Sequence, residues 1–300
     1  MNAPQKPRSP LKPLDDALAD LLAHQFNLLA DQPDRSLLDL PLEPATHDGN
    51  SWPEWGGTAG WGGEEGMRLH EWGLWGAADG TAALVWESPE GKVLGLSRAE
   101  FGWAAGEVAA RLAAAGVRPG DPVGICCGRS AELVAGIHGI LRAGGWYVPL
   151  DREYPAGRLA EMAAEVGRAA RGRLAVLVRE VRDEVRAELE RVGALPVELP
   201  EVGELARAGA GREGVGERLP EGLEGSAERP AYGIFTSGST GRPKAVAVSH
   251  RAAANRLLWM RERMGFGAAD VILLKTPVSF DVSVIELFLW TACGGRLAVL

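Results

Sequence analysis

Residues 236–244 read TSGSTGRPK and lie between two apolar runs, residues 232–235 and 245–248. Glycine lets a backbone approach a ligand closely and expose its N–H groups, while hydroxyls and a lysine add hydrogen-bond donors and positive charge. These groups suit the oxygen atoms of a phosphate. A flexible serine–glycine linker has a similar composition, but the two flanking strand-like runs favour a fixed loop. The candidate phosphate-binding residues are Thr236, Ser237, Gly238, Ser239, Thr240, Gly241 and Lys244.

The spacing of this loop differs from that of a Walker phosphate loop. A Walker loop places Ser or Thr directly after Gly-Lys, whereas Pro243 precedes Lys244 here and Ala245 follows it. The sequence therefore predicts nucleotide-phosphate binding by a loop outside the Walker class.

Strand-like and helix-like segments alternate on both sides of the loop. Ser97 is followed by Glu100 in a capping box, and Ser249 precedes a helical period, so both mark helix starts. Alternating strands and helices are typical of parallel sheets with flanking helices, which predicts an α/β fold. The expected strands are 82–87, 122–127, 146–150, 174–178, 232–235, 245–248, 271–275 and 296–300, and the expected helices are 97–115, 131–142, 156–170, 180–192, 249–264 and 283–292.

The other segments predict a leading helix, a linker and one long loop. Residues 14–32 repeat leucine at helical spacing, and residues 48–68 are rich in Gly and Trp without a helical or strand period. Residues 201–229 are rich in Gly and Glu, and we expect them to form a surface loop. The expected organisation is a helix and linker in 1–47, a Gly/Trp-rich linker in 48–68 and the α/β unit in 69–300.

Composition narrows the class of protein. The 300 residues are 46% hydrophobic and carry a formal net charge of −8, which favours a globular protein and disfavours binding to nucleic acid or an anionic membrane. No apolar stretch approaches the roughly 18 residues of a membrane-spanning helix. The odd number of cysteines, with an adjacent pair and no CxxC spacing, favours buried reduced thiols and no protein-ligated metal, as in a cytoplasmic protein. These cysteines are Cys126, Cys127 and Cys293.

The loop and the strand before it carry a family resemblance. From Tyr232 to Lys244 the chain fits Tyr-x-x-x-Thr-Ser-Gly-Ser-Thr-Gly-x-Pro-Lys. This pattern resembles the signature of the adenylate-forming (AMP-binding) superfamily, which includes peptide-synthetase adenylation domains, acyl-CoA ligases and luciferases. The chain departs from it at Ala245, where the family usually has Gly, and at Phe235, where it more often has Tyr. Alanine fits a strand, so we expect little effect at 245 unless that position needs a positive φ.

Two further blocks resemble the peptide-synthetase branch of this superfamily. Residues 141–155 read LRAGGWYVPLDREYP, similar to the LKAGGAYVPLDPxYP block of adenylation domains. Residues 274–288 read LKTPVSFDVSVIELF, similar to their KTPxSFDxSVxExF block. The helix that begins at Ser249 also resembles the helix after the phosphate loop in this branch, and we expect its His250 to be structural.

The second block implies a substrate contact. In amino-acid-activating relatives its aspartate pairs with the α-ammonium group of the substrate, which implies that role for Asp281. A partly buried carboxylate beside Phe280 needs a cationic partner, and a zwitterionic amino acid supplies one. The alternative is that Asp281 only caps the following helix. By the same resemblance, Val282 and Ile285 line the pocket for the substrate side chain.

The resemblance implies the large N-terminal subdomain of an adenylate-forming ligase, truncated. Such an enzyme activates an amino acid with ATP and Mg²⁺ as aminoacyl-AMP and loads it onto the phosphopantetheine of a peptidyl carrier domain in nonribosomal peptide synthesis. Residues 14–44 are weakly similar to the end of a condensation domain and its linker, a further partner. The family's adenine, ribose and Mg²⁺ motifs and its catalytic lid lysine lie beyond Leu300. We therefore identify no catalytic residue and expect weak or no adenylation by this chain alone.

Two other functions stay open. The first is an acyl- or aryl-acid-activating ligase, which Asp281 disfavours because those acids have no ammonium group. The second is a non-catalytic nucleotide-binding or regulatory remnant, which the presence of both Lys244 and Asp281 disfavours.

Overall fold

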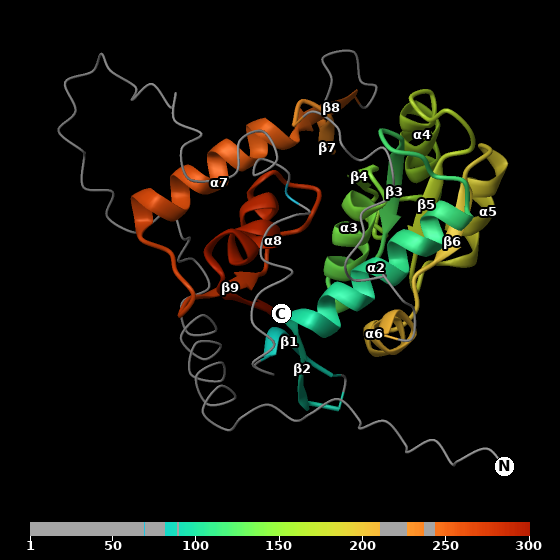
Figure 1. The fold of residues 1–300 in the computed structure, drawn as a ribbon. Helices are drawn as coiled ribbons and strands as arrows, with labels where there is room; N and C mark the ends of the chain where they lie inside the picture. Colours follow the sequence, from blue (N-terminus) through green and yellow to red (C-terminus); the bar gives the residue numbers. More distant parts are fainter. Residues whose placement is uncertain (1–68, 70–81, 89, 211–226, 237–243) are drawn as a thin grey trace, which may run out of the picture.

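The computed structural model describes residues 69, 82–88, 90–210, 227–236 and 244–300. The predicted helix at 14–32 and the Gly/Trp-rich segment at 48–68 lie outside the described residues. The described chain forms two β-sheets with helices packed around them (Figure 1). The predicted fold class, α/β with parallel strands and flanking helices, is confirmed.

Six strands form the larger sheet: β3 (Pro122–Cys126), β4 (Trp146–Pro149), β5 (Ala175–Val178), β6 (Leu195–Glu198), β7 (Pro230–Thr236) and β8 (Lys244–Ser249). Their order is β6-β5-β3-β4-β7-β8. Neighbours are parallel except β7 and β8, which are antiparallel. Parallel strands end at the same edge of a sheet, so the loops that follow β3, β4, β5 and β7 all leave from one edge.

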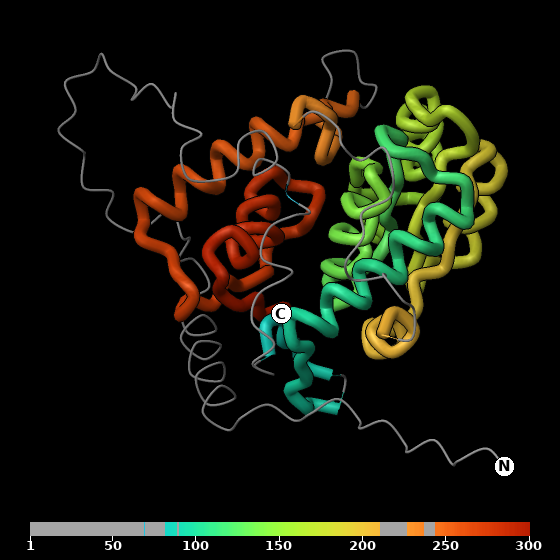
Figure 2. The backbone as a smooth tube through the Cα atoms, viewed as in Figure 1, coloured from blue at the N-terminus to red at the C-terminus, as the bar shows by residue number. Residues whose placement is uncertain are grey.

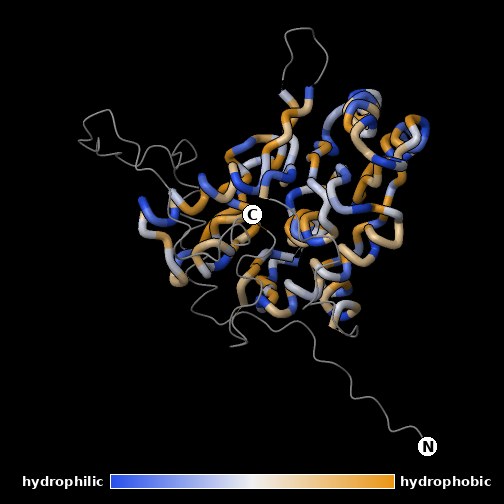
Figure 3. The backbone as a smooth tube through the Cα atoms, turned by 45° about the horizontal axis from the view of Figure 1, so that its top comes forward, coloured by the Kyte–Doolittle hydropathy of each residue, from blue (hydrophilic) through white to orange (hydrophobic). Residues whose placement is uncertain are grey.

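Both faces of this sheet are covered by helices. Val123 and Ile125 of β3 face a core shared with α2 (Arg98–Ala114), α3 (Ala131–Arg142) and α6 (Val202–Ala210). Cys126 and, in β4, Val148 face a second core shared with α4 (Ala156–Gly167) and α5 (Asp183–Arg191). Because successive side chains of a strand point to opposite faces, burial on both faces requires nearly continuous apolar strands. The strands β3, β4 and β5 are buried along their whole length, and Figure 3 shows apolar and hydrophilic stretches alternating along the chain.

A smaller sheet of four strands lies beside the larger one. It contains β1 (Ala82–Glu87), β2 (Val93–Ser97), β9 (Val271–Leu274) and β10 (Arg296–Val299) in the order β2-β1-β10-β9. β1 and β2 are antiparallel, and the other neighbours are parallel. Helix α7 (His250–Met264) leads from β8 to β9, and α8 (Val282–Cys293) connects β9 to β10. The two helices pack against each other, as the orange and red tube in Figure 2 shows.

One hydrophobic core joins the two sheets through α3 and α8. His138 of α3 is fully buried among the rings of Phe101, Phe288 and Trp290, at centroid distances of 5.1, 5.0 and 6.0 Å. Its Nε2 lies 3.2 Å from the carbonyl oxygen of Leu287 in α8. The polar contact and the ring packing fix α8, and with it the end of the loop that precedes α8, relative to the larger sheet.

Local capping signals predicted the helix starts well. Ser97 and Glu100 form the expected capping box at the start of α2, and the Ser249 side chain accepts the backbone N–H of Ala252 at the start of α7. Two helices end at glycines with left-handed φ of 74°, Gly265 after α7 and Gly294 after α8, a conformation that residues with a Cβ adopt only with strain.

The prediction of a surface loop over 201–229 is wrong for its first part, because Val202–Ala210 forms α6. Val202, Leu205, Ala206 and Gly209 recur at helical spacing and are buried against α2. Gly209 lies so close to α2 that a Cβ there would meet the carbonyl oxygen of Trp103 at 2.2 Å. The glycine that suggested a loop therefore permits a close helix contact. Residues 211–226 lie outside the described residues.

Strands β2 and β6 were not predicted, and each is short. β2 precedes the Ser97 cap directly and pairs antiparallel with β1, and β6 forms an edge of the larger sheet with partly exposed residues. Neither strand carries the continuous apolar run of the buried strands. In the part of the chain that the structure describes, none of the helices combines the length and apolarity that a membrane crossing requires.

Candidate functional site

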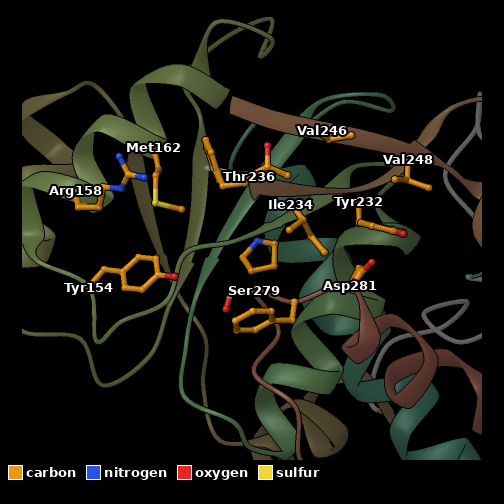
Figure 4. Close-up of a pocket in the computed structure, with 13 residues that line it drawn as sticks. Tyr154, Arg158, Met162, Tyr232, Ile234, Thr236, Val246, Val248, Ser279 and Asp281 are labelled. Carbon is orange, nitrogen blue, oxygen red and sulfur yellow. The ribbon is translucent and has the colours of Figure 1, made fainter. Parts of the chain in front are cut away.

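A cavity of about 580 Å³ lies at the carboxyl end of β4 and extends along β7 and β8. In α/β proteins this edge of a parallel sheet is the usual place for a ligand. The walls come from β7 and β8, from α4 and the loop before it, and from the loop between β9 and α8 (Figure 4). The lining residues are Pro149, Tyr154, Arg158, Met162, Tyr232, Ile234, Phe235, Thr236, Val246, Val248, Ser279, Phe280 and Asp281.

The two ends of the predicted phosphate loop lie side by side at this cavity. Thr236 ends β7 and pairs with Lys244, the first residue of β8. Thr236 lines the cavity, and both side chains are exposed. Of the predicted phosphate contacts the structure describes these two; Ser237, Gly238, Ser239, Thr240 and Gly241 lie outside the described residues.

The strands that bracket the loop were correctly predicted. Phe235 pairs with Ala245 in the antiparallel register of β7 and β8. Among described residues the one non-glycine position with a positive φ is Glu180, so Ala245 has ordinary strand geometry. The departure from the family's usual glycine therefore causes no backbone strain at this position.

Asp281 lies immediately before α8 and lines the cavity. Its side chain makes no capping hydrogen bond to the helix, although its backbone carbonyl accepts the N–H of Val284 at 3.1 Å. The helix-cap alternative for its carboxylate is therefore not supported. The carboxylate is exposed rather than partly buried as predicted, because the neighbouring Phe280 is itself 61% exposed and does not cover it.

Tyr232 and Asp281 lie next to each other on one wall of the cavity (Figure 4). Burial raises the pKa of the Tyr232 phenol, and the negative charge of Asp281 raises it further. The phenol therefore stays protonated at neutral pH and can donate a hydrogen bond. Its ring packs against Tyr147 of β4 with a centroid distance of 5.8 Å. The family signature contains Tyr232, but sequence reasoning gave it no role because its neighbour Asp281 is distant in sequence.

The opposite wall carries a cation. Arg158 of α4 lines the cavity beside Tyr154 and Met162 (Figure 4), and among the described lining residues it has the only positively charged side chain. Its guanidinium lies 3.7 Å from the Glu161 carboxylate, and its side chain is 38% exposed. An exposed ion pair at this distance is weak, so the Arg158 charge is available to an anionic ligand. The sequence alone does not reveal this role, because the place of Arg158 on the cavity depends on how α4 packs.

Two predicted pocket residues lie elsewhere. Val282 is 46% exposed, and Ile285 packs partly against the main hydrophobic core. Neither is among the residues that line the described cavity. Their assignment to a substrate side-chain pocket stays a prediction.

The cysteines and His250 have structural surroundings. Burial raises the pKa of Cys126 to about 12 and that of Cys127 to about 11, so both stay protonated at neutral pH. Among the described residues, no three His, Cys, Asp or Glu side chains form a group suited to a metal ion. His250 is buried, and its Nδ1 accepts the backbone N–H of Leu69 at 3.3 Å. This contact ties the start of α7 to Leu69, as expected of a structural histidine.

Known proteins resemble this chain in sequence. A family model described as "AMP-binding enzyme" matches residues 77–300. Tyrocidine synthase 3 of Brevibacillus parabrevis is 34% identical over 206 residues, which are 68% of this chain and 3% of that synthase.

Solved structures are also similar to this chain in fold and sequence. The nonribosomal peptide synthetase FmoA3 is 31% identical with a TM-score of 0.57, over 72% of this chain and 20% of that one. ATP-bound MatB from Rhodopseudomonas palustris is 25% identical with a TM-score of 0.62, over 78% of this chain and 45% of that one. The chain therefore spans less than half the length of each of these three proteins.

Proposed function

Because this chain belongs to the AMP-binding enzyme family, as an adenylation domain of the nonribosomal peptide synthetase type, we propose that it activates an amino acid with Mg²⁺-ATP as aminoacyl-AMP. Residues 69–300 would form the N-terminal part of the adenylation domain, preceded by a helix and linker at 1–47 and a Gly/Trp-rich linker at 48–68. The chain spans a small share of its synthetase relatives. We therefore propose that it acts within a larger site and has weak activity by itself.

In the first half-reaction, a carboxylate oxygen of the amino acid attacks the α-phosphorus of ATP. A new P–O bond forms, the bond to the bridging oxygen breaks, and pyrophosphate leaves. The contribution of this chain is to position two anions and to offset their charge, which are the main sources of rate enhancement for such a reaction. Thr236, Ser237, Gly238, Ser239, Thr240, Gly241 and Lys244 would hold the β- and γ-phosphates.

The substrate amino group would bind on the opposite side of the reacting carboxylate. Asp281 would pair with the α-ammonium, and the protonated Tyr232 phenol beside it would orient the Asp281 carboxylate by donating a hydrogen bond. Val282 and Ile285 remain the proposed contacts to the substrate side chain.

In the second half-reaction, the thiol of a phosphopantetheine group would attack the carbonyl carbon of the aminoacyl-AMP. The thiol loses its proton, a thioester forms and AMP leaves. The partner would be a peptidyl carrier domain, and a condensation domain upstream would use the loaded aminoacyl group. The synthetase relatives support these partners at the level of family.

One observation carries the choice of an amino acid over other carboxylic acids. The Asp281 carboxylate lines the cavity near the end of the phosphate loop and is not used as a helix cap. An anion at this place attracts a cationic substrate group and repels a substrate that carries only a carboxylate.

The test is pyrophosphate–ATP exchange by the polypeptide that the gene encodes. The panel pairs each proteinogenic amino acid with the carboxylic acid that lacks its amino group. We expect exchange with one or a few amino acids and none with their deaminated counterparts. Exchange with the deaminated acids alone would identify an acid-activating ligase instead. ATP binding without exchange for any acid would support a non-catalytic nucleotide-binding protein.

A further inference from the structure

Glu286 of α8 is a buried carboxylate whose two oxygens both accept hydrogen bonds from the end of β9. It is 3% exposed. Oε2 accepts the backbone N–H groups of Lys275 at 3.0 Å and Thr276 at 2.9 Å, and Oε1 accepts the Thr276 hydroxyl at 2.7 Å. Three donors from two consecutive residues therefore converge on one side chain.

A second residue of α8 holds the other end of the same loop. Ser283 is fully buried, and its hydroxyl lies 2.6 Å from the carbonyl oxygen of Phe280 and 3.4 Å from that of Val278. Within the loop, the Phe280 N–H donates to the Pro277 carbonyl at 3.0 Å. The loop of residues 275–281, which supplies one wall of the cavity, is thus bound to α8 at both ends.

The chemistry of Glu286 suits an acceptor rather than a partner for a cation. A carboxylate has two acceptor oxygens, and backbone N–H groups that donate to it form charge-assisted hydrogen bonds. In the part of the chain that the structure describes, the hydrogen bonds of Glu286 go to the loop. A leucine at this position would fill the space but leave the two N–H groups of Lys275 and Thr276 without an acceptor.

We propose that Glu286 is a positioning residue for the amino-acid site. By fixing Lys275 and Thr276 at the end of β9, it sets the path of the 275–281 loop and holds Asp281 at the distance from Tyr232 that ammonium binding requires. This inference rests on the proposed function, because Asp281 is a substrate contact only there. Glu286 itself does not line the cavity and would not touch the substrate.

The test compares Glu286→Leu with Glu286→Gln in the polypeptide that the gene encodes. Glutamine keeps one acceptor oxygen for the two N–H groups and an amide that can donate to the Thr276 hydroxyl. We expect Glu286→Leu to raise the KM for the amino acid about tenfold or more, since small displacements of positioning groups cost this much. The KM for ATP should stay within about twofold, and Glu286→Gln should restore most of the lost affinity.

A direct readout of the loop is amide hydrogen exchange at Lys275 and Thr276. These amides should exchange faster in Glu286→Leu and regain protection in Glu286→Gln. Glu132→Leu is the control: Glu132 is buried in α3, accepts the Val202 N–H at 3.1 Å, lies 3.8 Å from the Arg179 guanidinium and does not line the cavity. It should lower stability without a selective change in either KM.

The outcomes separate this inference from the proposed function. Unchanged exchange at Lys275 and Thr276 in Glu286→Leu would overturn the positioning role, whatever the activity. Equal increases in both KM values in Glu286→Leu would also overturn it, because a positioning role predicts a selective effect on the KM for the amino acid. If the native protein activates no amino acid, the proposed function fails, and hydrogen exchange still decides whether Glu286 orders the loop. If Glu286→Leu does not fold, Thr276→Val, which removes one donor, should give a smaller effect in the same direction on both readouts.

Discussion

Thr236 and Lys244 lie opposite each other across the antiparallel pair of β7 and β8. A cation therefore stands on the strand next to the one on which the glycine- and hydroxyl-rich loop begins. The carboxyl end of the parallel strand β4 lies at the same edge, where Pro149 lines the cavity. Strand pairing thus places the Lys244 charge beside Thr236 without any contact between distant segments.

We expect Lys244→Met to lower the kcat of pyrophosphate–ATP exchange by about 10² to 10³, the usual effect of removing one group that stabilises developing charge. Lys244 is exposed, so the melting temperature should hardly change. Lys92→Met removes another exposed lysine, in the turn between β1 and β2, and should leave the exchange rate unaltered. Equal losses in both variants would indicate a general effect of charge and contradict a phosphate contact by Lys244.

Asp281→Ala separates the substrate role from the helix-cap role by two measurements. A lost side-chain cap costs about 0.5–2 kcal/mol of stability, typically about 1. The Asp281 carboxylate makes no capping hydrogen bond, so we expect no loss of this size in urea unfolding. The kcat/KM for the amino acid should fall about 10² or more, as when one partner of a charge pair is removed. A stability loss near 1 kcal/mol with unchanged kcat/KM would restore the capping interpretation.

The parts of the fold that the sequence predicts are those with local causes. Ser97 and Glu100 cap α2 through neighbouring residues, and the strands on either side of the phosphate loop are short apolar runs. Helix α6 was not predicted because Gly209 serves a packing contact with a segment that is distant in sequence. Gly209 permits contact with the Trp103 backbone, which the local composition of α6 does not reveal.

The site residues also divide into those that local sequence motifs identify and those that depend on packing between distant segments. Asp281 and the ends of the loop were identified from contiguous motifs, and both line or border the cavity. Tyr232 and Arg158 were not identified as site residues, because their places depend on how β7, α4 and the loop before α8 pack together. The contacts of Glu286 with Lys275 and Thr276 likewise exist only after β9 and α8 have packed.

The close contact of α2 and α3 predicts a stability effect at Gly139. A Cβ at this position would lie 2.5 Å from Cβ of Val108 and 2.9 Å from the carbonyl oxygen of Ala105. Alanine gains about 1 kcal/mol of helix propensity over glycine, but overpacking costs about 1–3 kcal/mol. Since part of the contact is with backbone, we expect the overpacking cost to dominate and Gly139→Ala to be net destabilising in urea unfolding.

Gly157→Ala is the matched control for this prediction. Gly157 lies in α4, and a Cβ there would meet nothing within 4 Å. Its replacement should stabilise the protein by up to about 1 kcal/mol. If both alanine variants are stabilising, α2 and α3 can move apart at little cost, and the close contact is not a constraint on the fold.

His138 makes stability depend on pH on the acid side. Burial lowers its pKa from an ordinary 6.5 to about 4, with a small further contribution from the positive charge of Arg142, while the contact with the Leu287 carbonyl opposes the change. Because the folded-state pKa is depressed, the unfolded state binds the proton first as the pH falls. The folded protein is therefore stabilised above about pH 6.5, and this contribution is lost progressively down to about pH 4. The full loss is of order 3 kcal/mol.

His138→Gln isolates this contribution, because glutamine carries no charge at any pH. We expect the free energy of unfolding of the native protein to fall more steeply than that of the variant between about pH 7 and pH 4.5. Above about pH 7 the difference between the two proteins should be constant, since His138 is neutral in both the folded and unfolded states there. Parallel curves over the whole acid range would mean that the proton reaches His138 without unfolding. In that case the contact between α3 and α8 around His138 is open to water, and it does not fix α8 against the larger sheet.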